Sequence, residues 1–129
     1  MAEITHKGGV HVTMTIRIKR AYDVPDDKDG RWILVDRLWP RGISKEKAKI
    51  DYWPKELAPS NELRRWYGHD HERWAEFKKR YFSELDANPE QIEEFLKYVR
   101  KGDVTFVYSS TEQHLNNAVA LKEYIKARL

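Results

Sequence analysis

The chain has 129 residues, of which 24 are basic and 21 acidic, with five tryptophans and no cysteine. Its length suits one domain, its 12% aromatic content argues against a disordered chain, and the missing cysteine excludes disulfides and thiolate chemistry. A net charge of +3 is too small to indicate a nucleic-acid partner, so that interpretation depends on where the basic residues cluster.

The N-terminal segment carries no clear structural pattern. Residues 1–11 are expected to form a flexible leader, and residues 12–129 are expected to form a single domain. The leader lacks the apolar run of a signal peptide, and no stretch reaches the roughly 20 apolar residues of a membrane span. A cytoplasmic protein without a membrane partner is therefore the simplest expectation.

Four segments predict β-strands. Residues 13–20 alternate apolar and polar side chains, as a strand with one wetter face does. After turn-forming residues 24–30, residues 31–38 are almost continuously apolar, which is typical of a strand covered on both faces in a parallel sheet. Residues 50–53 predict a short edge strand, and residues 103–108 predict another buried one.

Helices are predicted between these strands. Ser60 and Asp70 are placed to cap two helices, and Asn88 with Gln91 forms a capping box for a third helix, which Gly102 ends. This helical segment separates the buried strands at 31–38 and 103–108 by about sixty residues, a crossover length that predicts parallel, neighbouring strands.

The last helix is predicted to follow the strand at 103–108 directly. Ser110 and Gln113 have the spacing of a capping box, and an amphipathic pattern continues to Leu129. The predicted fold class is therefore α/β: a small three-layer single domain with a mostly parallel sheet flanked by helices.

A ligand crevice is expected at one edge of this sheet. Crevices of parallel sheets lie outside the carboxyl ends of the strands, so residues 37–42 and 108–117 should face one space. Arg37 and Arg41 offer donor forks that match phosphate or carboxylate, and Trp39 between them offers a stacking face. Alternatively, these side chains pair with acidic neighbours, cover the core or lie in solvent.

Other polar residues are candidates for the same crevice because they lie near strand ends or near the predicted helix start, whose free N–H groups attract anions. The further ligand-binding candidates are Lys19, Arg20, Ser109, Asn116 and Asn117. The candidates for proton transfer are His69 and His114, followed by Tyr108 and Glu112. Ordinary helix capping and solvated surface positions are the structural alternatives.

Three groups of residues are interpreted as structural. Asp36 should point to the opposite sheet face from Arg37, because strand side chains alternate, and it is expected to cap a helix or hold an arginine. The residues 69–71, His-Asp-His, are neighbours that rarely converge on one ion, so no metal and no cofactor is predicted. The basic runs 64–65 and 78–80 alternate with glutamates, as solvated helix surfaces do.

Several idiosyncratic motifs resemble a known family. They are residues 18–23, 35–44, 56–60, 66–69 and 116–118. Together they resemble the YeaO-like branch of the domain of unknown function 488 family (DUF 488), from about residue 14 to 125. The resemblance implies a single α/β domain of a small soluble bacterial or archaeal protein, and it brings no agreed activity.

The same resemblance limits the chemistry. Longer relatives carry a Cys-His-Arg cluster at the start of the last helix, where this chain has Leu115, Asn116 and Asn117. A thiol-based mechanism therefore does not carry over, and the resemblance supports the position of the crevice more than any reaction.

The sequence thus predicts a small protein with a crevice for an anionic, phosphate-bearing ligand, with nucleotide or base processing as the first reaction class to consider. One alternative is a nucleic-acid-binding module with Lys19, Arg20, Arg37 and Arg41 on phosphates. Another is a protein-interaction domain. The residues leave enzymatic turnover and oligomeric state open.

Overall fold

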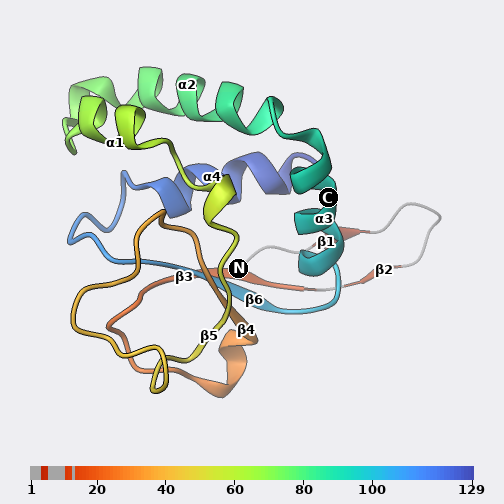
Figure 1. Ribbon diagram of the computed structural model, residues 1–129. Coiled ribbons are helices and arrows are strands. Elements are labelled where there is room, and N and C mark those ends of the chain that lie inside the picture. The colour runs from red at the N-terminus through yellow and green to blue at the C-terminus, as the bar shows by residue number, and fades with distance from the viewer. Residues whose placement is uncertain (1–3, 6–10, 13) are drawn as a thin grey trace.

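A four-stranded parallel sheet forms the centre of the molecule (Figure 1). The computed structural model describes residues 4–5, 11–12 and 14–129. The strands are β3 (Ile16–Arg20), β4 (Arg31–Leu34), β5 (Ile50–Tyr52) and β6 (Val104–Tyr108), in the order β3-β6-β4-β5. The predicted α/β class is confirmed, as are the parallel pairing of β4 with β6 and the edge position of β5.

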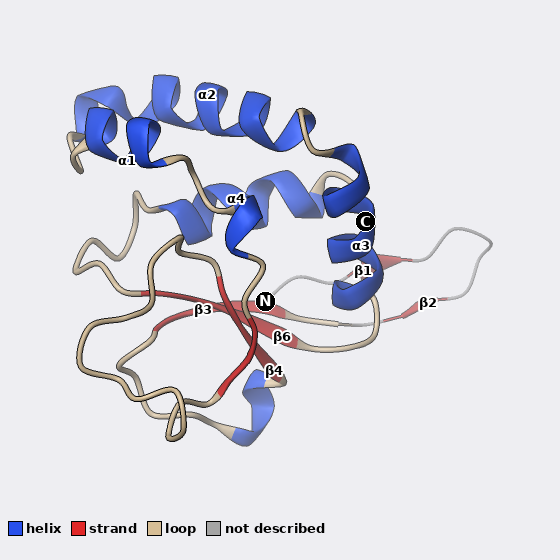
Figure 2. Ribbon diagram, viewed as in Figure 1, coloured by secondary structure: helices blue, strands red, loops and turns tan. Residues whose placement is uncertain are grey.

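The helices lie together on one face of the sheet (Figure 2). They are α1 (Asn61–Tyr67), α2 (Trp74–Asp86), α3 (Pro89–Val99) and α4 (Asn117–Lys126). Loops that follow β3 and β4 cover the other face, together with a short 3-10 helix at Asp27–Asp29. In the part of the chain that the structure describes, none of the helices is long and apolar enough to cross a membrane.

Apolar side chains fill both sides of the central strands. Along β4, Ile33 packs with the helices, whereas Trp32 and Leu34 pack under the loops on the opposite face. Each of these three side chains is almost completely buried. The near-continuous apolar run of this strand therefore reflects burial on two faces, as expected of a central parallel strand.

Two further short strands precede the sheet. β1 (Ile4–Thr5) pairs with β2 (His11–Val12) in an antiparallel two-stranded sheet. The predicted leader, residues 1–11, lies mostly outside the described residues, as does Thr13 of the predicted first strand. That strand begins at Ile16 in the sheet.

The strand β4 is shorter than its apolar pattern predicts. It ends at Leu34, not at residue 38, although the N–H of Val35 still donates to Val107 (3.0 Å). Beyond this point the indole of Trp53 donates to the carbonyl of Asp36 (2.8 Å), in a bond made to a side chain and not to a neighbouring strand. The chain therefore leaves the sheet before the arginines.

The last helix begins later than its predicted capping box. α4 starts at Asn117, and Asn116 is its N-cap, with a side-chain oxygen that accepts from the N–H of Val119 (3.0 Å). The chain at Ser109 and Ser110 is held by Arg20, which donates to their carbonyls (2.9 Å and 2.8 Å). Residues 109–116 form a loop instead.

The other predicted caps are partly confirmed. Ser60 accepts from the N–H of Leu63 (3.1 Å) and caps α1. Asp70 caps a 3-10 turn, His71–Arg73, that leads into α2. Asn88 occupies the predicted N-cap position of α3, with Pro89 in the first turn, but the predicted capping box is absent, because the side-chain amide of Asn88 donates backward to the carbonyl of Glu84 (3.1 Å).

Candidate functional site

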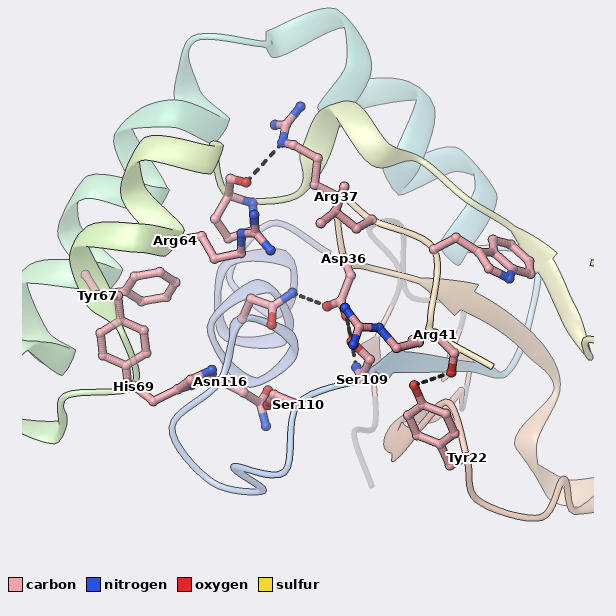
Figure 3. Close-up of a pocket in the computed structure, with 15 residues that line it drawn as sticks. Tyr22, Asp36, Arg37, Arg41, Arg64, Tyr67, His69, Ser109, Ser110 and Asn116 are labelled. Atoms are coloured by element: carbon pink, nitrogen blue, oxygen red, sulfur yellow. Dashed lines mark hydrogen bonds between the residues drawn. The ribbon is translucent and has the colours of Figure 1, made fainter. Parts of the chain in front are cut away.

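A pocket of about 330 Å³ lies where β4 and β6 end (Figure 3). It brings together the chain after β4, the helical pair α1 and α2, and the loop 109–116. Its lining residues are Tyr22, Asp36, Arg37, Leu38, Trp39, Arg41, Pro59, Arg64, Tyr67, His69, Phe77, Ser109, Ser110, Asn116 and Asn117. The two segments that the sequence placed at one crevice therefore share this pocket.

Asp36 holds these segments together. Its Oδ2 accepts from the backbone N–H (2.9 Å) and the hydroxyl (2.7 Å) of Ser109, and its Oδ1 accepts from the side-chain amide of Asn117 (2.9 Å). That amide also donates to the carbonyl of Val35 (2.9 Å). Asp36 is structural, as expected, but it shares the pocket with Arg37 because strand alternation ends at Leu34.

The two predicted arginines differ in their surroundings. Arg37 donates from Nε to Pro59 (3.1 Å) and from Nη2 to Ala58 (2.9 Å), so backbone carbonyls occupy much of its fork. Arg41 is exposed, and in the described part of the chain its guanidinium makes no hydrogen bond or ion pair. In Figure 3, Arg41 extends toward the pocket centre, and Arg37 points away from it.

Arg64 is the main pocket residue that the sequence analysis missed. It was assigned to a solvated helix surface, but its side chain reaches the pocket from α1 (Figure 3). Tyr67, one helical turn later, lines the same wall, and Phe77 of α2 stacks on it at 4.4 Å between ring centroids. The three-residue spacing of Arg64 from the buried Tyr67 was the available signal.

Aromatic side chains form the opposite wall. Trp39 packs edge-on against Trp53, with 5.5 Å between the ring centroids, and its indole donates to the carbonyl of Ile43 (2.6 Å). Tyr22 donates its hydroxyl to the carbonyl of Arg41 (2.9 Å) and remains 44% exposed at the pocket mouth with Leu38. This wall combines flat apolar surface with a neighbouring cation.

The remaining ligand-binding candidates divide into two groups. Ser109, Asn116 and Asn117 do line the pocket, but their polar atoms are largely used in the hydrogen bonds to Asp36 and in capping α4. Lys19 and Arg20 lie elsewhere, because Lys19 binds the buried Asp29 (2.9 Å) and Arg20 holds the loop 109–116.

Lys19 is not free to bind a ligand because its ammonium group pairs with Asp29. Its carboxylate is fully buried, and burial opposes ionisation, but the hydrogen bonds from Lys19, from the N–H of Asp26 and from the indole of Trp32 outweigh that cost. The pKa of Asp29 therefore lies below its ordinary value. Lys19 anchors the loop after β3.

Two of the proton-transfer candidates lie at a separate cavity of about 260 Å³. Tyr108 and His114 line it together with Lys19 and Arg20, which the sequence analysis placed at the main crevice. Burial raises the pKa of Tyr108 above its ordinary value. The predicted grouping of these four residues with Arg37 and Arg41 is therefore wrong.

Glu112 and His69, the other two candidates for proton transfer, lie in different places. Glu112 pairs with His71 (2.7 Å), and although burial acts to raise its pKa, the neighbouring imidazole and backbone N–H groups bring that pKa below its ordinary value. His69 lines the pocket, with its ring against that of Tyr67. Among the described residues, no three histidine, aspartate or glutamate side chains are grouped to hold a metal ion.

The fold and the pocket define a small α/β protein with a cation-lined cavity at the carboxyl ends of its parallel strands. The chain belongs to the family described as the inactive DUF488-N3 subclade, whose family model matches residues 15–129. The predicted relationship to DUF 488 is thereby confirmed.

Relatives in two bacterial groups match most of the chain. It is 36% identical over 114 residues to the uncharacterised protein YeaO of Escherichia coli (strain K12), and the matched region covers 88% of this chain and 99% of that protein. It is 37% identical over 113 residues to the uncharacterised protein Rv3073c of Mycobacterium tuberculosis (strain ATCC 25618 / H37Rv), and the matched region covers 88% of this chain and 95% of that protein. No solved structure matches it.

Proposed function

We propose that the protein binds a small anionic ligand, with phosphate-bearing molecules as the first class, in the pocket beyond β4 and β6. The observation that carries this proposal is the charge of the pocket wall. Arg41 and Arg64 contribute two cations whose side chains reach the pocket, and Arg37 adds a third positive charge to its lining although its fork binds backbone carbonyls. Asp36, the one carboxylate among the described lining residues, already accepts three hydrogen bonds. Guanidinium forks match the oxygens of phosphate.

The aromatic wall favours a ligand that also carries a flat ring. Tyr22 lies on the same side of the pocket as Arg41, to whose carbonyl it donates, and Trp39 is also a lining residue, so a ring and an anionic group can be contacted together. The pocket volume of about 330 Å³ is at the lower end of the range of ligand pockets, roughly 300–1,000 Å³. A nucleotide is the ligand of this kind to test first.

Binding without turnover is the preferred form of the proposal. The family to which the chain belongs is described as inactive. Glu112, a candidate acid or base, is engaged with His71 outside the pocket, which also supports this preference. Nucleotide or base processing in the same pocket is the second form of the proposal.

The proposal can be tested by thermal shift and calorimetry with phosphate, ribose 5-phosphate, nucleoside monophosphates and the matching uncharged nucleosides. We expect the phosphorylated compounds to raise the melting temperature, because a ligand that binds only the folded state stabilises it. The uncharged nucleosides should bind more weakly. Assays for release of phosphate or base then separate binding from turnover.

Arginine variants locate the binding. Arg41→Ala and Arg64→Ala should each weaken binding about 10- to 100-fold, since a hydrogen bond to a charged group contributes about 1.5–3 kcal/mol. Arg65→Ala is the matched control, because Arg65 is an exposed arginine on the same helix outside the pocket. Unchanged binding in both pocket variants would place the ligand elsewhere.

The nucleic-acid alternative is distinguished by salt. Contacts to a phosphate backbone weaken steeply with ionic strength, whereas a discrete pocket for one small anion is less sensitive. Labelled single- and double-stranded oligonucleotides should therefore be titrated at low and moderate salt. Tight, strongly salt-dependent binding of oligonucleotides, with no binding of mononucleotides, would favour the alternative.

A further inference from the structure

His69 has an unusual backbone at the pocket rim. It follows Gly68, the left-handed C-cap of α1, and is itself left-handed with a φ of 56°. Among the described residues, it is the one residue other than glycine with a positive φ. Glycine would meet the needs of this turn without steric cost, so the presence of histidine calls for another reason.

The side chain of His69 is exposed at the pocket rim, packs against one aromatic ring and, among the described residues, has no polar partner. Its ring lies edge-on against Tyr67, with 5.8 Å between centroids, and Tyr67 is itself anchored by its hydroxyl, which donates to the carbonyl of Leu115 (2.7 Å). In the described part of the chain, neither imidazole nitrogen makes a hydrogen bond or ion pair. Figure 3 shows the ring directed toward the side of the pocket formed by Ser110 and Asn116.

Charges around the pocket couple this imidazole to an anion. The charged or titratable groups on the surrounding elements are Arg64 and Tyr67 of α1, Asp70 and His71 of the following turn, Asp36, Arg37 and Arg41 beyond β4, and Glu112 of the loop. An anion bound between the pocket arginines favours a cation at this imidazole, because opposite charges stabilise each other.

We propose that His69 is a proton-dependent ligand contact, which takes up a proton when the pocket binds an anion and then donates to it. This inference rests on the proposed function and adds that the affinity for the anion depends on the protonation of His69. Histidine ordinarily changes charge between about pH 5 and 8, so binding should tighten across that range as the pH falls. The strained turn is retained because it places a titratable side chain at the pocket that Arg41 and Arg64 also line.

Sulfate is the suitable probe, because its charge stays constant across this pH range and any change in affinity comes from the protein. Calorimetry at about pH 5.5 and about pH 8 should show roughly tenfold tighter binding at the lower pH for the unmodified protein, the size of one charge-assisted contact. Repeating the titration in buffers with different ionisation enthalpies should show proton uptake on binding.

Two substitutions separate a binding role from a structural one. His69→Asn tolerates the left-handed turn and should bind sulfate with nearly the same affinity at both pH values. His69→Gly should also lose the pH dependence while the ligand-free protein melts at a higher temperature, because the strain is removed. His71→Asn, the neighbouring control, should retain the pH dependence, since His71 pairs with Glu112 outside the pocket.

The possible outcomes test the two proposals separately. If neither sulfate nor phosphate binds at either pH, both the proposed function and the role of His69 are overturned. If sulfate binds the unmodified protein equally at both pH values, or His69→Asn keeps the full pH dependence, the anion pocket stands and the role of His69 is overturned.

Discussion

Asp36 joins parts of the chain that are far apart in sequence. Its partners Ser109 and Asn117 lie 73 and 81 residues further along, at the end of β6 and the start of α4. A carboxylate that accepts several hydrogen bonds is well suited to this role, because each bond to an ionised acceptor is about twice as strong as a neutral one. The same bonds leave Asp36 little capacity to repel an anionic ligand.

Replacement of this carboxylate by an amide should destabilise the protein. In Asp36→Asn, one acceptor oxygen becomes an NH2 group that faces donors from Ser109 or Asn117, so the free energy of unfolding should fall by about 1–3 kcal/mol. Urea denaturation measures the change. Asp27→Asn, at an exposed position in the 3-10 helix after β3, is the control and should stay within about 0.5 kcal/mol of the unmodified protein. Equal effects in the two variants would contradict this role for Asp36.

Individual pocket residues were only partly predictable from sequence. Arg37, Trp39 and Arg41 were identified because they follow an apolar strand, where parallel sheets place their crevices. Arg64 was not identified, because its helix pattern is that of an exposed surface, and only the packing of α1 against α2 places it at the pocket. Lys19 was misassigned because its buried partner Asp29 lies in the short 3-10 helix after β3, whose position against Lys19 no local pattern specifies.

The helices and strands themselves were more accessible to sequence analysis than their ends. Capping residues placed α1, α2 and α3, and the alternation or continuity of apolar residues placed β3, β4 and β6. The start of β4 was predicted correctly, but its C-terminal end and the start of α4 were wrong, and at both places the chain is held by contacts between distant residues, to the carbonyl of Asp36 and from Arg20. Local sequence patterns contain no information about contacts with residues so far away in the chain.

The turn into β4 depends on one glycine. Gly30 has a φ of 64°, and a Cβ atom placed on it would lie 2.0 Å from the carbonyl oxygen of Asp103. The N–H of Arg31, the next residue, donates to that same carbonyl (3.1 Å), so the close approach starts the pairing of β4 with β6. Neither the backbone nor the carbonyl can move without loss of this pairing.

Gly30→Ala should therefore reduce the free energy of unfolding by more than about 3 kcal/mol, because it adds a backbone clash to an unfavourable φ. Gly42→Ala is the matched control. Gly42 also has a positive φ, 83°, but a Cβ atom on it would have no neighbour within 4 Å, so only the conformational cost of about 1 kcal/mol applies. Chemical denaturation of both variants measures the difference, and similar losses would show that the close approach to Asp103 is unimportant.

Both sides of the whole molecule depend on the same two strands. β4 and β6 contribute side chains to the helix-side core and to the smaller cluster under the loops. Loss of packing on one side would therefore disturb strands that also support the packing on the other side. The loop-covered side contains Trp32, Trp39 and Trp53, and the helix side contains Trp66 and Trp74. The tryptophans therefore report on both faces.

We expect the two faces to unfold in one cooperative transition, as small single domains usually do. The double variant Trp66→Phe with Trp74→Phe leaves fluorescence from the loop-covered face alone. Its urea midpoint by fluorescence should coincide with its midpoint by far-ultraviolet circular dichroism, which follows the helices. An earlier fluorescence transition would show that the loop-covered face opens as a separate unit.

The late start of α4 has a consequence for how this architecture diversifies. Asn116 caps the helix from its own first turn, while Asp36 and Arg20 secure the chain at residues 109–110, so both ends of the intervening segment are fixed independently. Between these two anchors, Glu112 pairs with His71 and the carbonyl of Leu115 accepts from the hydroxyl of Tyr67. A change in the length of this loop is therefore expected to be tolerated only where it preserves both contacts.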